Sequence, residues 1–205
     1  MNTGMRAGLR WSTVLALLAG VWGCATVETQ RVSTEETIDL TDSWNDTDSR
    51  LVADEMIDDM LTFPWIQQHQ QRSGEQRPTV IIQRIYNRSH EHIAVDTFVN
   101  DLKRAMIRSG KVDFVVGGDE RDDVRGERKD QELYAREGSQ AEMGQEEGAD
   151  FALSGSIDSI VDQVGGKRVT FYQVDLKLID MTSNREAWNG QKKIKKVQTR
   201  SRFSL

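Results

Sequence analysis

The stretch from residue 151 to residue 179 constrains the fold most, because it reads as one long β-hairpin. Two runs rich in β-branched and aromatic residues, 151–164 and 169–179, flank the turn Gly165-Gly166-Lys167-Arg168. Two adjacent glycines permit the positive φ angles of a tight hairpin turn. Apolar and polar residues alternate on both arms, which is typical of an antiparallel pair with one buried and one wet face. The residues expected on the buried face are Phe151, Leu153, Ile157, Tyr172, Val174, Leu176 and Leu178.

Apolar residues at three- and four-residue spacing predict a helix from about Leu51 to Phe63, with Asp46 or Thr47 as its N-terminal cap and Pro64 at its end. A second helix is expected over 95–109, because Gly110 fits a C-terminal cap. The strongly charged residues 117–138 predict either an exposed helix or a mobile excursion. Ser139 and Gly148 predict the start and the end of a further short helix.

The continuous apolar run at 78–86 predicts a central strand that is covered on both faces. Residues 67–77 are polar and are expected to be a surface connection, 112–116 a short strand, and 185–194 a last strand beside the hairpin. The predicted order is α-β-α-β-α-β-β-β. The fold class is therefore α/β in the α+β sense: a mixed sheet that ends in an antiparallel meander, with helices packed on it.

Composition limits what such a domain does. A chain of 205 residues with 37% hydrophobic residues can bury one core without disulfides. The net charge of −6 and the pI of about 5.2 argue against general binding to nucleic acid. Cys24 is the only cysteine of the sequence, so neither an internal disulfide nor a cysteine metal cluster is possible.

The N-terminus reads as an export signal over residues 1–23. Arg6 and Arg10 precede a short apolar run that is too short for a comfortable membrane-spanning helix. Val21-Trp22-Gly23-Cys24 resembles the lipobox of bacterial lipoproteins, in which the cysteine is acylated after cleavage; Trp22 departs from the small residue that is usual there. The alternative is an ordinary secretory signal. We expect lipid attachment at Cys24, and Ala25 in place of an aspartate favours the outer membrane.

Residues 24–43 are polar, lack helical periodicity and contain no proline, so we expect a flexible tether. As a coil of nearly 20 residues, its ends would lie ~25 Å apart, and fully stretched it would span at most ~70 Å. The globular domain is then expected over 44–197, followed by a C-terminal tail over 198–205.

Three short motifs suggest chemistry, but each has a simpler interpretation that we favour. His90-Glu91-His92 could bind a metal, yet it lacks a third ligand at a clear spacing, so a solvated loop is favoured. Gly117-Gly118-Asp119 lacks the lysine and hydroxyl residue of a phosphate loop, so a turn is favoured. Ser154-Gly155-Ser156 lies within a strand, where glycine more often marks a bulge. We expect no catalytic residues, no metal site and no cofactor.

A basic end stands out on this acidic chain. Lys192, Lys193, Lys195 and Lys196 are followed by Arg200 and Arg202. Lysines on an edge strand protect it against aggregation, and this interpretation is favoured. The alternative is that the four lysines bind an acidic partner or a phosphate-rich surface.

Several segments together resemble the LpoB family of penicillin-binding-protein activators, over nearly all of the expected domain. The segments are Trp44–Arg50, Tyr86–Ile93, Gly148–Ile157, Phe171–Asp180 and Trp188–Gly190. The resemblance implies a fold similar to the N-terminal domain of TolB. It also implies an outer-membrane lipoprotein that docks on an accessory domain of a bifunctional class A penicillin-binding protein and stimulates glycan polymerisation and crosslinking. The best-known member of the family has a long, Pro-rich tether, whereas the tether expected here is short and contains no proline. Either the synthase therefore extends outward or the partner differs.

The leading hypothesis is therefore a non-enzymatic, lipid-anchored periplasmic regulator that binds and activates a class A penicillin-binding protein. The first alternative is an interaction module of another envelope assembly, such as an export or flagellar complex. The second is a hydrolase or nucleotide-binding enzyme, for which a deep acidic pocket at His90 and His92 would be evidence. Nucleic acid is not an expected partner, and the expected location is the periplasmic face of the outer membrane.

Overall fold

The computed structural model describes residues 28–200, in two units that divide between Glu36 and Thr37. In the first unit, the described residues are irregular apart from a turn in which the Glu36 N–H donates to the Ser33 carbonyl at 3.1 Å. The second unit holds all the described helices and strands. Within residues 28–200, no helix is long and apolar enough to cross a membrane.

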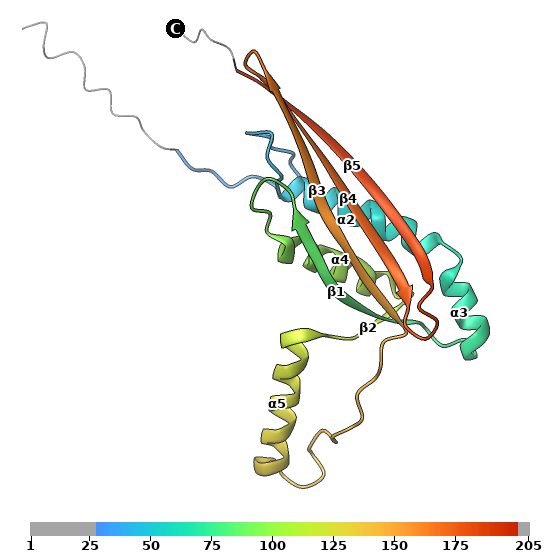
Figure 1. Cartoon of the computed structure of the whole chain (residues 1–205). Helices are drawn as coiled ribbons and strands as arrows, with labels where there is room; N and C mark the ends of the chain where they lie inside the picture. The colour runs from blue at the N-terminus through green and yellow to red at the C-terminus, as the bar shows by residue number, and fades with distance from the viewer. Residues whose placement is uncertain (1–27, 201–205) are drawn as a thin grey trace, which may run out of the picture. The chain divides into compact units, whose positions relative to one another are not determined.

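Five strands of the second unit form one mixed sheet in the order β2-β1-β3-β4-β5 (Figure 1). Strand β1 pairs in parallel with both β2 and β3, and β3, β4 and β5 follow as an antiparallel meander. The strands are β1 (Thr79–Arg88), β2 (Asp113–Phe114), β3 (Phe151–Val164), β4 (Lys167–Asp180) and β5 (Glu186–Thr199). The predicted mixed sheet with a C-terminal meander is confirmed.

The hairpin of β3 and β4 forms as the sequence predicts. Its register joins Val164 to Lys167 and Phe151 to Asp180 without a break. Gly165 and Gly166 have φ angles of 55° and 81°, which are the positive values that the turn requires. All seven residues that were expected on the buried face of the hairpin are buried.

Four helices are present in the described residues: α2 (Asp46–Thr62), α3 (Trp65–Ser73), α4 (Val95–Ser109) and α5 (Gly118–Tyr134). The cap of α2 is Asn45, and not Asp46 or Thr47 as predicted. The Asn45 side chain accepts from the Asp48 N–H, and the Asp48 carboxylate accepts from the Asn45 N–H, each at 3.0 Å. This reciprocal pair is a capping box. Gly110 ends α4 in the left-handed conformation, as predicted.

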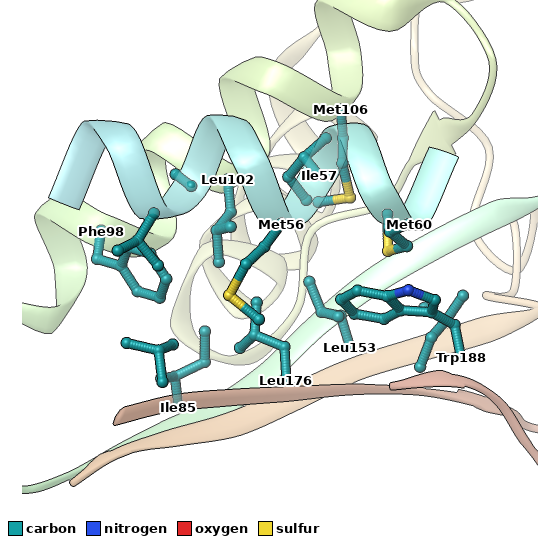
Figure 2. Packing of buried hydrophobic residues seen from close by; sticks show 14 of the residues in the cluster. Met56, Ile57, Met60, Ile85, Phe98, Leu102, Met106, Leu153, Leu176 and Trp188 are labelled. Atoms are coloured by element: carbon teal, nitrogen blue, oxygen red, sulfur yellow. The ribbon is translucent and has the colours of Figure 1, made fainter. Parts of the chain in front are cut away.

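Helices α2 and α4 cover one face of the sheet, and the hydrophobic core lies between the two helices and that face (Figure 2). From α2 come Met56, Ile57 and Met60, and from α4 come Phe98, Leu102 and Met106. Figure 2 shows them above Ile85, Leu153, Leu176 and Trp188, which belong to four different strands. Burial of these side chains stabilises the fold by about 1.5–3 kcal/mol for each large apolar group.

Two predictions about the strands are wrong. The 78–86 run is not covered on both faces, because Gln83, Arg84 and Tyr86 on β1 are exposed. The last strand continues to Thr199 rather than ending at 194. Asp42, which precedes the predicted start of the domain at 44, is buried.

Two predictions about helices are also wrong. The expected surface connection at 67–77 is largely α3, whose only buried residues are Trp65 and His69, one turn apart. The Trp65 indole N–H also donates to the Met60 carbonyl at 2.8 Å. No helix forms at 139–147, where the chain is exposed and irregular. Instead α5 is the exposed helix of the charged region; none of its residues is buried, and it stands apart from the sheet (Figure 1).

One row across the sheet, Gly155–Leu176–Gly190, brings backbone and side chains unusually close. A Cβ atom on Gly155 would lie 2.1 Å from the Asp175 carbonyl oxygen, and one on Gly190 would lie 2.3 Å from the Trp188 ring. Real Cβ atoms do not approach so closely, so these glycines allow a local geometry that larger residues would disrupt. The register shift in β1 between Ile82 and Ile85 lies opposite this row.

We predict that Gly155→Ala destabilises the domain by about 1–3 kcal/mol, because the added methyl group cannot be accommodated without moving the backbone. Urea unfolding followed by circular dichroism measures the change. The matched control is Gly126→Ala in α5, where nothing lies within 4 Å of an added Cβ. Alanine at that helical position should stabilise by about 0.5–1 kcal/mol. Equal effects of the two substitutions would contradict the close-approach explanation.

Candidate functional site

The face of the sheet opposite α2 and α4 carries a hollow of about 530 Å³. It crosses β1, β3, β4 and β5, so it extends over three inter-strand spacings, or about 14 Å. Small side chains at Ser154 and Ser156, and the backbone of the glycine row, line its floor. We call this hollow, together with the side chains that line it, the open-face trough.

Three cations line the open-face trough without a counterion. Arg84 and Arg88 flank the half-exposed Tyr86 ring, with their guanidinium carbons 5.8 and 5.7 Å from the ring centroid. Lys177 projects from β4 on the same face. Among the described residues, none of the three makes an ion pair or a side-chain hydrogen bond. These are positions at which an incoming anion would meet unneutralised positive charge.

The acidic residues of the open-face trough are already engaged by neutral partners. The Asp175 carboxylate accepts from the Gln173 and Gln191 amides at 2.7 and 2.8 Å. The Glu186 carboxylate accepts from the Asn189 amide at 2.6 Å. These acids therefore do not form direct ion pairs with the nearby arginines and lysine.

Arg84, Tyr86 and Arg88 were not predicted as site residues, because the apolar start of their strand indicated burial on both faces. The signal was present in the alternation, since polar or amphipathic residues occupy every second position from 84 to 88. Period-2 alternation at the end of an apolar run indicates that one face of the strand emerges into solvent.

The four lysines of the basic end divide between the two faces of β5, which is the edge strand of the sheet. Lys193 and Lys195 are exposed on the open face and have no ion-pair partner among the described residues. Lys192 and Lys196 lie on the helix side, where Lys192 pairs with Glu55 of α2. The structure therefore does not bring the four lysines together as one patch.

Lys196 belongs to a cluster that fastens residues 39–43, which we call the strap, to the domain. Its ammonium group lies 2.6 Å from Asp48 and 2.9 Å from Asp39, and donates to the Ser43 carbonyl at 2.9 Å. The Lys196 side chain is only 10% exposed. Burial alone would lower its pKa, but the hydrogen bonds to Asp48 and Asp39 outweigh burial and raise the pKa above its ordinary value.

Asp42 fastens the middle of the strap to β4. Its buried carboxylate accepts a hydrogen bond from the Thr170 hydroxyl and lies 2.9 Å from the Arg168 guanidinium. The Asp42 carbonyl accepts from the Tyr172 hydroxyl at 3.0 Å. Residues that were expected to be tether thus supply buried polar contacts to the hairpin.

Glu91 of the His90-Glu91-His92 motif also contributes to this region. Its carboxylate accepts from the Trp44 N–H at 2.8 Å and from the Tyr172 hydroxyl. His90 contacts the Ser159 hydroxyl through its backbone N–H, and His92 is exposed. Burial first, and the Glu91 carboxylate second, raise the pKa of Tyr172 well above its ordinary value. The contacts of Glu91 are structural ones that join the loop to Trp44 and β4.

The remaining sequence candidates lie at places that suit structural roles. Gly117 is the N-cap of α5, and a Cβ atom there would meet Ile81 at 2.6 Å. Ser154 and Ser156 are strand residues, and the Ser156 hydroxyl donates to Asp158 at 2.7 Å. Within residues 28–200, no group of three or more His, Cys, Asp or Glu side chains is placed to hold a metal ion. Cys24 lies outside the described residues.

The described residues form an α+β domain with an antiparallel meander at one end of the sheet and one sheet face that no helix covers. The family model described as peptidoglycan-synthase activator LpoB matches residues 48–194, well over half of the chain. The chain therefore belongs to the LpoB family. Members of this family are non-catalytic activators, which confirms the prediction that the chain is not an enzyme.

Several solved structures are similar to the chain at low sequence identity. The LpoB C-terminal domain from Escherichia coli matches at 15% identity and a TM-score of 0.42, covering 72% of this chain and 98% of that one. The equivalent domain from Salmonella enterica matches at 14% identity and 0.35, covering 64% and 93%. The lipoprotein GNA1162 from Neisseria meningitidis matches at 13% identity and 0.38, covering 60% and 86%. No curated protein matches significantly.

We predict that Lys196→Met destabilises the domain by about 2–3 kcal/mol, because it leaves the buried Asp48 carboxylate without its cation. Lys193→Met is the matched control, since Lys193 is exposed, has no ion-pair partner among the described residues and lies three positions before Lys196 on the same strand. The control should change the free energy of unfolding by less than about 0.5 kcal/mol. Urea denaturation of both variants tests this, and equal stabilities would show that the strap cluster contributes nothing.

We also predict that the domain loses stability in alkali. Folding raises the pKa values of Tyr172 and Lys196 above 10.0 and 10.5. Groups of this kind stabilise the fold fully below their unfolded pKa, and the contribution disappears as the pH rises through the folded pKa. The free energy of unfolding should therefore fall above about pH 10. Tyr172→Phe should flatten that fall, whereas Tyr134→Phe at the exposed end of α5 should leave it unchanged; unfolding at pH 8 and pH 11 measures both.

Proposed function

We propose that this chain is a lipid-anchored periplasmic regulator that binds and activates a class A penicillin-binding protein. The observation that carries the proposal is membership of a family of peptidoglycan-synthase activators over residues 48–194. This membership favours a synthase as the partner over an export or flagellar complex. A likeness of the fold to the N-terminal domain of TolB stays a prediction.

A regulator without catalytic groups acts by differential affinity. If the chain binds the active conformation of the synthase more tightly than the inactive one, binding shifts the synthase population toward the active state. An affinity ratio of tenfold corresponds to about 1.4 kcal/mol of shift. The stimulation should therefore saturate with the concentration of the chain and require no turnover of the chain itself.

The most direct test adds the purified chain to each class A penicillin-binding protein of the same organism and follows lipid II polymerisation. We predict faster glycan synthesis with one of them, saturating at a stoichiometry near one to one. Lys129→Met, at an exposed position on α5, serves as a folded reference for preparation effects. Absence of both stimulation and binding with every synthase would rule the proposal out.

We further propose that acylation of Cys24 anchors the chain to the periplasmic face of the outer membrane, where multiple acyl chains would hold it stably. The strap begins at Asp39, so the segment from Cys24 to Asp39 would reach at most about 50 Å when fully extended. This short reach requires either a synthase that extends toward the outer membrane or a different partner from that of long-tethered relatives.

Metabolic labelling with a clickable fatty acid tests the anchor. The wild-type chain should be labelled and should float with outer-membrane vesicles, whereas Cys24→Ser should lose both properties because the acylated thiol is gone. Thr26→Ser, two residues further on, is the matched control and should be labelled like the wild type. Label of equal strength on the Cys24→Ser variant would contradict the proposed anchor.

A further inference from the structure

Two further unpaired cations extend those of the open-face trough into one band of five cations, which lies beside the amide-bonded carboxylates of Asp175 and Glu186. Lys193 and Lys195 lie on β5 next to Gln173 and Phe171 of β4, two and four positions from the end of the trough at Gln191. Within residues 28–200, the five open-face cations have no ion-pair partner; they are Arg84, Arg88, Lys177, Lys193 and Lys195. The whole chain carries a net charge of −6, so this band is opposite in sign to the protein as a whole.

The acids elsewhere on the domain make the asymmetry sharper. Asp54 and Asp58, one turn apart, project from the exposed side of α2, on the covered side of the sheet. Charges arranged in this way orient an approaching acidic partner toward the open face and repel it from the helical side.

The width of the trough suits an extended occupant. It is bounded on one side by the ends of Arg84 and Arg88, and on the other it runs out at β5, the edge of the sheet. A width of about 14 Å corresponds to four residues of extended chain. Tyr86 offers a half-exposed aromatic surface between the two guanidinium groups, where an apolar side chain can pack while its acidic neighbours meet the arginines.

We infer that the open-face trough is the docking site for an acidic, extended segment of the peptidoglycan synthase. The inference rests on the proposed function, because it names the surface through which that function is exercised. Arg84 and Arg88 would bind carboxylates of the segment, Lys177 would contact a third acid across the floor, and Lys193 and Lys195 would speed association at the rim.

The test compares two charge-reversed variants of the full-length chain in detergent. The trough variant is Arg88→Glu with Lys177→Glu, and the matched control is Lys129→Glu with Arg136→Glu, which makes the same charge change at exposed positions on and after α5. Binding to the purified synthase and stimulation of lipid II polymerisation are both measured. We expect the trough variant to bind at least tenfold more weakly, and the control to remain within twofold of the wild type.

Three further measurements make the outcome decisive. Thermal unfolding shows that both variants are folded. The double variant Arg84→Lys with Arg88→Lys keeps the positive charge but loses the bidentate geometry of the guanidinium groups, so this variant should weaken binding by an intermediate factor. The wild-type affinity should also fall as salt rises. If the wild type binds and stimulates while the trough variant does so equally well, the docking inference is overturned and the proposed function stands. If the wild type binds no synthase, the proposed function fails and the docking inference with it.

A third arm separates a protein partner from a glycan. Co-sedimentation with purified peptidoglycan sacculi is measured for the same variants. Loss of sacculus binding in the trough variant, together with undiminished binding to the synthase, would assign the trough to the carboxylate-bearing cell-wall polymer and overturn the inference. Loss of synthase binding with unchanged sacculus binding supports it.

Discussion

The alternation of the β3–β4 hairpin is the constraint on which the rest of the structure depends. A strand pair with apolar residues on one face only needs a covering layer on that face alone, and α2 and α4 form this layer. The other face then remains in solvent, where polar residues and five unpaired cations replace a second layer of helices. α5 could not supply that layer, because its surface is charged all round and none of its residues is buried. The same pattern that builds the core therefore leaves a surface available for a partner.

The second determinant is electrostatic and reaches across the whole sequence. Lys196, near the end of the last strand, holds Asp39 and Asp48 from the beginning of the domain, and Tyr172 holds Asp42 and Glu91. Both sets of contacts include residues of the strap, so the strap connects Lys196 to Tyr172. Because the strap precedes α2 directly, these contacts join the N-terminal segment of the domain to its central hairpin.

Much of the fold could be predicted from the sequence, because the deciding signals are local. The turn glycines at 165 and 166 and the alternation of the two arms define the hairpin without reference to the rest of the chain. Helix α3 was not predicted because its glutamines make the segment polar overall, although Trp65 and His69 are spaced one helical turn apart. The strap could not be predicted, since Asp42 and Thr170 lie 128 positions apart and neither is apolar. The trough was missed for a different reason, namely that the apolar start of β1 suggested burial of the whole strand.

Lysine acetylation footprinting of the full-length chain, read by mass spectrometry with and without its synthase, tests the central claim that the open sheet face is the functional surface. The account predicts that Lys177, Lys193 and Lys195 lose reactivity when the synthase is added, while Lys129 on α5 reacts as before. Protection of Lys129 with unchanged reactivity of the three open-face lysines would contradict the account and move the contact surface to the charged helix.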